Sequence, residues 1–455
     1  MESNVPRLTR RNLLKKSLLA GGVIAGFPLV LRAAEGQANR VNVAFIGVGG
    51  RGGADLAECV KVGCNVVGLC DTDAGRLAGA ARKHPGAKTY SDYRQMLDKQ
   101  KDIEAVVVAT PDHHHFHASM MAVKLGKHVY CEKPLTHSVW EARQLTQAAR
   151  QAKVATQLGT QGHSNEPIRL LAEWLAAGVI GAVREVHIWT DRPAGWWPQG
   201  LDRPAGEDPI PASLNWDVWI GPAPMRPFKS GVYHDFKWRG WWDFGTCALG
   251  DIGCHALDLP WFALKLTAPT HIEATSFGGK PECGPLWSDI AYQFPANGAR
   301  PALKLCWYDG RNRNTPNDSP AWKSMLPLRD RLGLAADARL PENGQLYVGE
   351  KGNIHVGEGG PRLVPEIKMK DFVRPEKTLP RSIGHHAEWL AACRGGPAPG
   401  SNWDFSGPLS EAVLAGNLAI RLAKPIDWDG PNIKATNAPE AAPLIRREYR
   451  QGWAL

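Results

Sequence analysis

The sequence lacks the cysteine patterns on which small, loop-rich folds depend. Its nine cysteines are scattered from Cys59 to Cys393, their number is odd, and none of them forms a C-x-x-C pair. A disulfide framework or a structural zinc site normally requires a closely spaced, paired set. We therefore expect hydrophobic cores to stabilise the 455 residues, which suffice for two or three domains.

The sequence also lacks a long basic run beyond its first residues. The formal net charge is +9 at pH 7, but residues 1–34 carry +5 of it, which leaves +4 for the rest of the chain. Proteins that bind nucleic acid concentrate lysine and arginine in one stretch or on one face. We therefore expect no nucleic-acid partner.

The head of the chain has no apolar run long enough for a membrane anchor. Its apolar run, residues 18–31, has fourteen residues, whereas about 20 are needed to cross a bilayer. The run follows Arg10 and Arg11 and precedes small residues, which is the order of a cleaved export signal. The paired arginines resemble a Tat signal, which exports folded proteins. We expect a signal over 1–34, a protein that is periplasmic or otherwise exported by the Tat pathway, and no stable membrane anchor.

A glycine-rich turn follows the head and links a buried strand to the start of a helix. In "VNVAFIGVGGRGG", Gly47, Gly49 and Gly52 form the pattern G-x-G-x-x-G. The glycines permit a tight turn, close approach to a pyrophosphate and packing of helix on strand. The next strand ends in Asp71, whose carboxylate can accept hydrogen bonds from the adenosine ribose and would repel a 2′-phosphate. The set predicts NAD, with NADP less favoured; an ordinary turn without a ligand is the alternative.

Strand and helix patterns alternate up to about residue 165. One apolar strand ends at Thr110 and Pro111, and another runs into Glu132 and Lys133 in "HVYCEKP". Such alternation predicts a parallel, doubly wound sheet, with ligands at the carboxyl ends of its strands. We expect a Rossmann domain over 40–165.

The remainder, 166–455, has a different texture. Residues 192–227 hold eight prolines, too many for regular structure, and several strand patterns between 271 and 360 are separated by turn residues. These strands predict a large, mostly antiparallel, open sheet in a second α/β domain. Helical patterns return over 384–425, and we expect those helices to pack back toward the Rossmann domain.

The stretch "GTCALGDIGCHALD" places Asp251 and His255 four residues apart, on one face if the segment is helical. Transfer of a hydride from an alcohol requires a group that removes the hydroxyl proton, and histidine titrates in the right range. Asp251 would then orient the imidazole or bind a neighbouring hydroxyl. The alternative is that Asp251 caps the helix and His255 is a core residue.

Taken in order, three motifs resemble the Gfo/Idh/MocA family of glucose–fructose oxidoreductases and inositol dehydrogenases. They are the glycine turn with Asp71, the E-K-P at Glu132 to Pro134, and the G-x₅-D-x₃-H from Gly245 to His255. The resemblance covers 41–453, and it is strongest to exported members. It implies an NAD-binding Rossmann domain and a C-terminal α/β domain that lines the substrate pocket and often mediates assembly, so that we expect a homodimer or homotetramer.

The resemblance also implies site residues. Those expected to be catalytic are Lys133, Asp251 and His255. The family pattern T-P-[ND]-x-x-H would make His115 a cofactor-side loop residue. Those expected to bind the cofactor are Gly47, Val48, Gly49, Gly50, Arg51, Gly52, Asp71, Thr110, Pro111, His115, Glu132 and Lys133. One departure is that relatives often carry three glycines where this chain has Gly245, Thr246 and Cys247.

A metal site is the alternative interpretation of the histidine-rich run "DHHHFH", residues 112–117, to which Asp251, His255 and Asp258 could add ligands. Because the run coincides with the family pattern, we expect no metal.

Tryptophan is abundant: the chain has eighteen, and eleven lie between Trp189 and Trp307. Indole faces stack on sugar rings, so a carbohydrate substrate is indicated; packing in a core or subunit interface is the alternative. Candidates for the pocket wall are Trp196, Trp197, Trp238, Trp241 and Trp242. Arg239 and Asp243 are interleaved with them, and with Trp197 they are the candidates for substrate binding.

These features predict an NAD-dependent oxidoreductase that acts on a secondary hydroxyl of a sugar, polyol or glycoside. Because soluble NAD is expected to be scarce outside the cytoplasm, we expect the cofactor to be held tightly and recycled in place. One alternative is a redox-neutral enzyme that cleaves glycosides through a transient keto-sugar. The other is a non-catalytic sugar-binding protein with a vestigial Rossmann site.

Overall fold

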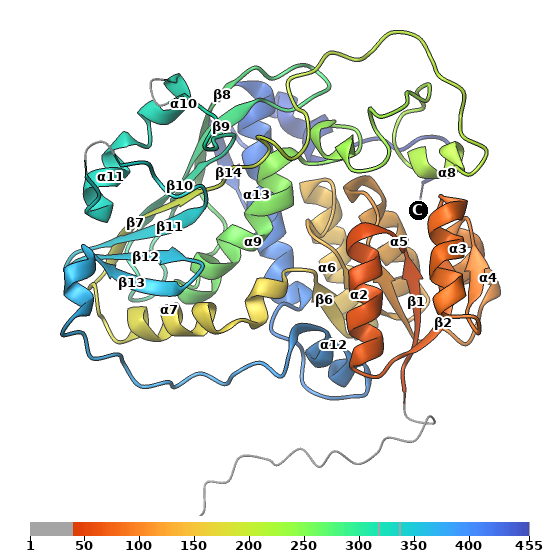
Figure 1. Cartoon of the computed structure of the whole chain (residues 1–455), viewed down its shortest axis with the longest axis horizontal. Coiled ribbons are helices and arrows are strands. Elements are labelled where there is room, and N and C mark those ends of the chain that lie inside the picture. The colour runs from red at the N-terminus through yellow and green to blue at the C-terminus, as the bar shows by residue number, and fades with distance from the viewer. Residues whose placement is uncertain (1–39, 317–318, 336–337, 455) are drawn as a thin grey trace, which may run out of the picture. The chain divides into compact units, whose positions relative to one another are not determined.

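The computed structural model describes residues 40–316, 319–335 and 338–454. The export signal expected over 1–34 lies outside these residues. Within them the chain forms two sheets, of six and nine strands, with helices between them (Figure 1). Among the described residues, no helix combines the length and the apolar character that crossing a membrane requires.

The six-stranded sheet is parallel throughout, with the order β3-β2-β1-β4-β5-β6. Its strands are β1 (Asn42–Ile46), β2 (Asn65–Cys70), β3 (Lys88–Tyr90), β4 (Ala105–Val108), β5 (His128–Cys131) and β6 (Thr156–Leu158). The intervening helices are α2 (Gly50–Lys61), α3 (Ala74–Lys83), α4 (Tyr93–Lys99), α5 (Asp112–Lys124) and α6 (Val139–Ala152). The predicted doubly wound sheet is confirmed, and its strand order reverses between β1 and β4, where such sheets bind ligands.

The nine-stranded sheet has the order β13-β12-β11-β7-β10-β9-β8-β14-β15. Its strands are β7 (Val183–Trp189), β8 (His271–Phe277), β9 (Trp287–Phe294), β10 (Leu303–Tyr308), β11 (Gly344–Gly349), β12 (Asn353–Gly357), β13 (Gly360–Val364), β14 (Ile426–Asp429) and β15 (Lys434–Ala435). Only β7 and β10 pair in parallel, so the expected, mostly antiparallel sheet is confirmed. The short strands β13, β14 and β15 were not expected.

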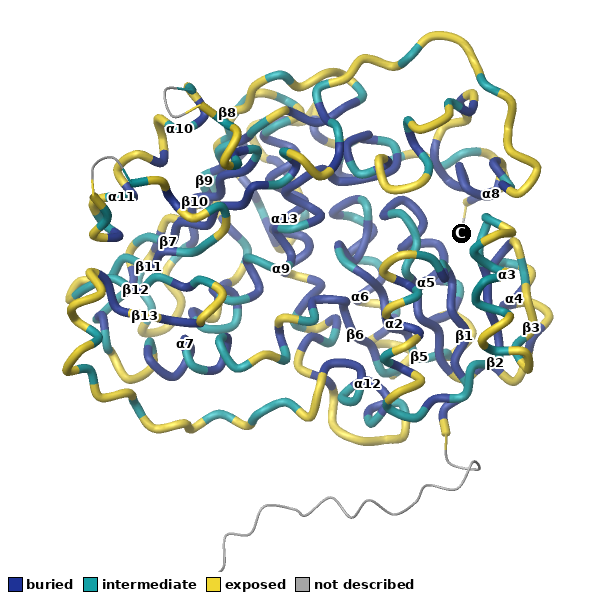
Figure 2. Tube along the Cα trace, viewed as in Figure 1, coloured by how far each residue is buried: buried dark blue, intermediate teal, exposed yellow. Residues whose placement is uncertain are grey.

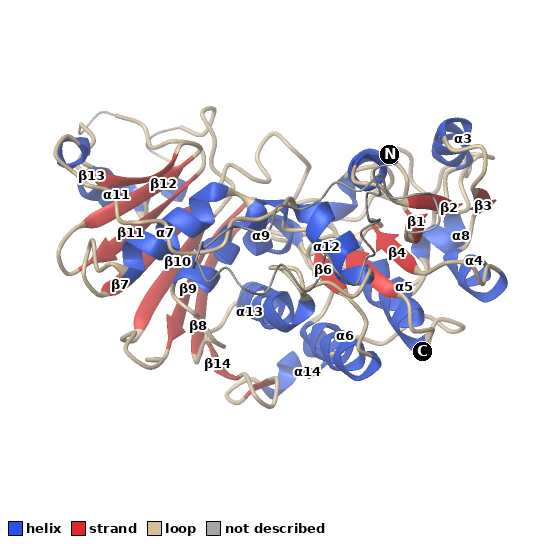
Figure 3. Ribbon diagram, turned by 90° about the horizontal axis from the view of Figure 1, so that it is seen from below, coloured by secondary structure: helices blue, strands red, loops and turns tan. Residues whose placement is uncertain are grey.

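Three helices pack on one face of this sheet: α7 (Glu166–Ala176), α9 (Cys247–Ala263) and α13 (Trp403–Leu422) (Figure 3). Helix α13 also packs on α6, and α12 (His385–Cys393) packs on α2, so these two late helices contact helices of the six-stranded sheet. Figure 2 shows α13 buried along most of its length. Gly416 permits its close approach to the sheet, because a Cβ there would lie 2.0 Å from the Tyr292 hydroxyl.

The remaining elements are short. They are α8 (Trp216–Ile220), α10 (Pro320–Lys323), α11 (Leu326–Leu332), α14 (Ala442–Ile445), and the 3₁₀ turns η2 (Gln161–Ser164), η3 (Lys237–Gly240), η4 (Glu366–Met369) and η5 (Pro439–Ala441).

Residues 213–245, which we call the aromatic segment, form a small core of their own. Stacked and edge-to-face rings hold it together, among them Trp216, Trp219 and Phe244. Its backbone is hydrogen-bonded to the end of β2, with the Asn215 amide 2.9 Å from the Thr72 carbonyl oxygen. Regular structure here is limited to α8 and the 3₁₀ turn η3, and aromatic packing orders the rest.

Candidate active site

The glycine turn after β1 has the close contacts that its pattern predicts. Gly47 has φ +83°, and a Cβ there would lie 2.4 Å from the Ala109 carbonyl oxygen. A Cβ on Gly52 would lie 2.0 Å from the carbonyl oxygen of Gly47, so that only glycine lets α2 pack at this distance. The first N–H groups of α2 have no partner within the helix and open toward the turn, which fits a bound pyrophosphate.

Asp71 is bonded to the turn itself. Its carboxylate accepts a hydrogen bond from the Val48 amide at 3.0 Å and another from the Asp73 amide at 2.9 Å. Burial raises the pKa of Asp71, and these two bonds and the Arg76 charge oppose that shift. The carboxylate lies at the end of β2, where the ribose of a bound NAD would be recognised, so these residues fit the cofactor.

A cavity of about 440 Å³ extends from the glycine turn to α9. Of the predicted site residues, it is lined by Gly47, Gly49, Gly50, Arg51, Asp71, Thr110, Pro111, Glu132, Lys133, Trp197, Arg239, Asp251 and His255. The nucleotide-binding turn and the predicted catalytic residues therefore share one chamber. Val48 and Gly52 support its wall from behind.

The chamber's floor is a buried ion-pair group. Lys133 Nζ, at the end of β5, lies 2.8 Å from Asp251 Oδ1, and Arg239 Nε lies 3.0 Å from the same oxygen. Burial alone would raise the pKa of Asp251, but the two cations hold it well below its usual value. Asp251 is therefore ionised, and it fixes the positions of both cationic side chains.

His255 lies one turn further along α9 and lines the same cavity. Burial, aided by the charge of Lys133, lowers the pKa of His255 to about 3, below the near-neutral range expected from the sequence, so its imidazole is neutral at physiological pH. Asp251 bonds to the two cations instead of orienting His255. The alternative in which Asp251 caps the helix is wrong, because α9 begins at Cys247, four residues before it.

Arg239 is held by aromatic rings as well as by Asp251. Its guanidinium lies 3.9 Å from the Phe236 ring centroid, 4.3 Å from that of Trp238 and 5.9 Å from that of Trp197. These rings form part of the cavity wall. The wall is apolar with one cation in it, which is the lining expected for a small polar ligand.

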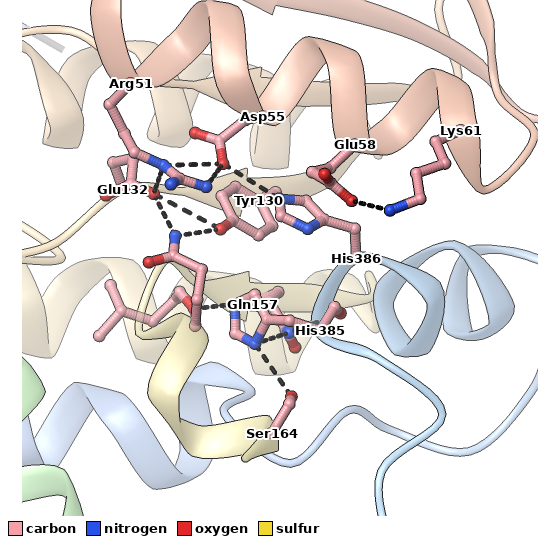
Figure 4. A network of polar contacts seen from close by, with 12 residues as sticks. Arg51, Asp55, Glu58, Lys61, Tyr130, Glu132, Gln157, Ser164, His385 and His386 are labelled. Atoms are coloured by element: carbon pink, nitrogen blue, oxygen red, sulfur yellow. Dashed lines mark hydrogen bonds and ion pairs between the residues drawn. The ribbon is translucent and has the colours of Figure 1, made fainter. Parts of the chain in front are cut away.

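Arg51 and Glu132, which were predicted to contact the cofactor, line the cavity and also belong to a polar network (Figure 4). Arg51 pairs with Asp55 and lies 3.3 Å from Glu132, and His386 of α12 bonds to Asp55 at 3.0 Å. Burial and the Asp55 charge raise the pKa of Glu132 to about 8. The network ties α2, β5 and α12 together beside the pyrophosphate position.

Two family descriptions match the chain in series. Residues 41–160 match "Oxidoreductase family, NAD-binding Rossmann fold" and residues 171–315 match "Oxidoreductase family, C-terminal alpha/beta domain", both for Gfo/Idh/MocA proteins. The chain belongs to the Gfo/Idh/MocA oxidoreductase family. The predicted family and cofactor class are thereby confirmed.

Curated relatives match only part of this Gfo/Idh/MocA chain. Inositol 2-dehydrogenase of Rubrobacter xylanophilus is 31% identical over 151 residues, which are 32% of this chain and 43% of that protein. The 1,5-anhydro-D-fructose reductase of Ensifer adhaerens is 34% identical over 130 residues, 28% of this chain and 38% of the relative. Each match spans less than half of the relative's length.

A solved structure supports the fold over more of the chain. The WlbA dehydrogenase from Bordetella pertussis, in complex with NADH and UDP-GlcNAcA, superposes with a TM-score of 0.59. The match covers 86% of this chain and 98% of that one at 16% identity. The likeness is one of architecture.

This family member departs from the common glycine pattern at the start of α9, and the departure has a structural consequence. Thr246 Oγ1 donates a hydrogen bond of 2.6 Å to Asp112, the first residue of α5. Asp112 is buried and lines the cavity, whereas the sequence analysis considered it only as a possible metal ligand. Burial raises the pKa of Asp112 to about 7, and the Thr246 hydroxyl partly opposes that shift.

Several predicted site residues lie elsewhere. His115 is inside α5 instead of on a cofactor-side loop, and its ring nitrogens lie 2.7 Å from the Pro134 carbonyl oxygen and 2.9 Å from that of Thr110. His115 therefore contacts the loops that follow β4 and β5, and it does not line the cavity. Asp243 pairs with Arg226, outside the cavity lining.

Two of the five candidate tryptophans are also misplaced. Trp241 is fully buried in the aromatic segment's core, and Trp242 lines a separate, small pocket with Arg421. Trp241 is therefore part of a hydrophobic core, and Trp242 lines a different pocket. Trp196, Trp197 and Trp238 do line the main cavity.

The histidine-rich run anchors the aromatic segment. His113 Nε2 and His114 Nε2 lie 3.0 Å and 2.9 Å from the Trp219 carbonyl oxygen. Burial lowers the pKa of both histidines, so neutral rings suit this position. Over the described ranges, no group of three or more histidine, cysteine or acidic side chains is arranged to hold a metal.

Replacing Asp112 by asparagine should make stability less dependent on pH. The folded-state pKa of Asp112 is raised, so as pH rises from about 4 to 7 only the unfolded state ionises and the wild-type protein loses stability. Asparagine keeps the shape and the acceptor for Thr246 but has no charge. The free energy of unfolding of Asp112→Asn, measured in urea, should rise relative to that of the wild type between pH 5 and pH 8, by roughly 1 kcal/mol or more.

Thr246→Val is the matched control. It removes the hydroxyl that favours ionised Asp112, and it should therefore steepen the loss of stability at high pH. Parallel pH–stability curves for wild type and Asp112→Asn would contradict this account.

Proposed function

We propose that this protein is an NAD-dependent oxidoreductase that acts on a secondary hydroxyl of a sugar, polyol or glycoside. The observation that carries the proposal is that one cavity holds the glycine turn, Asp71, Lys133, Asp251 and His255. The relatives named as an inositol dehydrogenase and an anhydrofructose reductase support this substrate class. The aromatic wall around Arg239 suits a ring that carries hydroxyl groups.

Different residues would transfer the proton and stabilise the developing charge. A bound NAD would accept or return the hydride. Lys133, held by Asp251, would donate a hydrogen bond to the reacting oxygen and stabilise its negative charge. His255 is neutral and therefore has a lone pair with which to take the hydroxyl proton. Arg239 would bind a neighbouring hydroxyl while Asp251 holds its guanidinium in place.

We further propose that NAD is held tightly and does not leave between turnovers. The aromatic segment supports this, because its residues Val218, Trp219, His234 and Asp235 form part of the cavity wall over the nucleotide-binding end. It is fastened there by the ion pair between Arg76 and Asp235 and by its backbone bonds to the end of β2. Opening this wall requires these contacts to break together.

The same enclosure favours a second candidate function, redox-neutral cleavage of a glycoside. A hydride that is taken from a sugar and kept in a closed site can be returned to the same sugar after a substituent has been eliminated. A nitrophenyl glycoside distinguishes the two reactions. Release of nitrophenol without net NADH indicates cleavage, and a keto-sugar without nitrophenol indicates the dehydrogenase.

We also propose that the protein is exported by the Tat pathway to the periplasm and assembles as a homodimer or homotetramer. The export proposal is supported by Arg10 and Arg11 ahead of the apolar run. A cofactor that travels inside a folded protein is consistent with this route.

Protein purified without added cofactor should contain NAD in close to one equivalent, identified by mass spectrometry after denaturation. Asp235→Ala, which removes the partner of Arg76, should lower this content severalfold. Glu350→Ala is the matched control, because it breaks an exposed ion pair with Arg184 far from the cavity. NAD-free protein that binds the cofactor only at high added concentration would contradict the proposal.

His255→Ala should leave NAD bound and lower turnover about 10²–10⁴-fold, the usual contribution of a positioned general base. The variant and wild type should be compared by NAD content, thermal melting and the rate of keto-sugar formation. His84→Ala, at the end of α3 and outside the cavity, is the control and should behave as wild type. Equal loss of cofactor and fold in His255→Ala would return His255 to a structural role.

A further inference from the structure

Trp196 differs from the other tryptophans that line the cavity. It is 51% exposed, whereas Trp197, Trp219 and Trp238 are at most 7% exposed. Exposed indole surface contributes nothing to the stability of a core. A large ring that lines a cavity and is left exposed is available to stack on a ligand.

The exposed ring is firmly held. Trp196 Nε1 donates a hydrogen bond of 3.1 Å to the buried Asp191, and the Arg192 guanidinium lies 3.5 Å from the centroid of the indole ring. Arg192 also pairs with Asp191, so the two side chains fix the indole along its edge and over one face. A side chain held in this way loses little further freedom when a ligand stacks on it.

The supporting loop is anchored to the large sheet. The Gly310 amide, just after β10, donates to the Arg192 carbonyl oxygen at 2.6 Å, and Asn312 Nδ2 bonds to the Ala194 carbonyl oxygen at 3.2 Å. The Asp191 amide bonds to Asn343 Oδ1 at 3.2 Å. The loop that carries Trp196 is therefore held by hydrogen bonds to residues next to the large sheet. It is separate from the aromatic segment.

We propose that Trp196 and Arg192 form an outer subsite that binds a second ring of the substrate. This inference rests on the proposed function and extends it: the substrate would be a glycoside or oligosaccharide, with one ring at Lys133 and His255 and the next ring stacked on Trp196. Both positions line the same cavity, so a single ligand can reach both. Arg192 lies over one face of the indole, so the second ring would stack on the opposite face.

The subsite itself suits a neutral sugar. Arg192 is already paired with Asp191, so the subsite does not require an anionic group from the ligand. Neutral hexose rings can stack on the exposed face of Trp196.

The test compares sugars that differ only in the presence of a second ring. Binding of glucose, maltose and cellobiose to the NAD-loaded protein is measured by titration calorimetry for wild type, Trp196→Ala and Trp196→Phe. In wild type, at least one disaccharide should bind at least tenfold more tightly than glucose. Trp196→Ala should abolish that advantage and change glucose affinity less than twofold, and Trp196→Phe should keep part of it.

Trp322→Ala is the matched control, because Trp322 is a partly exposed indole of α10 that lies outside this cavity. It should leave every affinity unchanged. Thermal melting of Trp196→Ala should match wild type, since an exposed ring is removed.

Equal affinity of wild type for glucose and for both disaccharides, or no binding of any disaccharide, would overturn the subsite. So would a change of oligomeric state in Trp196→Ala, which would make the ring an interface residue. Because the readout is binding, the two proposals fail separately. Tighter binding of a disaccharide without turnover would support the subsite and contradict the proposed oxidoreductase activity. Turnover without tighter binding of a disaccharide would support the activity and contradict the subsite.

Discussion

The ion pair between Lys133 and Asp251 is the contact on which the rest of the site depends. It joins the end of β5, in the nucleotide-binding sheet, to α9, which packs on the large sheet. Both side chains are largely buried, and removal of one partner of such a pair typically costs about 3–5 kcal/mol. Because Asp251 also holds Arg239, and His255 follows it by one turn, the pair sets the relative positions of all these side chains.

The second constraint is the attachment of the aromatic segment to the six-stranded sheet. The aromatic segment has its own core, yet it is fastened to the end of β2 and to the histidines at the start of α5. The histidine-rich run therefore holds the aromatic segment against the six-stranded sheet's helix α5. An ionised Asp251 and a neutral His255 together place a nitrogen lone pair beside a buried cation, an arrangement that suits reversible alcohol oxidation.

Features that depend on residues close together in the sequence could be predicted from the sequence. Strand periodicity and the glycine turn were sufficient for the parallel sheet, and the order of motifs led to Lys133, Asp251 and His255. Features that depend on long-range packing were missed: the hydrogen bond between Asp112 and Thr246 joins residues 134 positions apart. Local spacing likewise gave no sign that His115 faces away from the cofactor side or that β14 and β15 complete the large sheet. The only available signal for the Asp112 bond was Thr246 itself, which stands where relatives often have glycine.

The most direct measurement is a single-turnover experiment in which protein that carries NAD⁺ is mixed, without air, with a panel of neutral sugars and glycosides. The absorbance of reduced nicotinamide is followed in wild type and in Asp251→Asn. The account predicts that at least one sugar reduces the bound cofactor, that deuterium at the oxidised carbon slows the step severalfold, and that Asp251→Asn slows it at least tenfold while NAD remains bound. An unchanged rate in Asp251→Asn, or no reduction by any sugar despite bound NAD⁺, would contradict it.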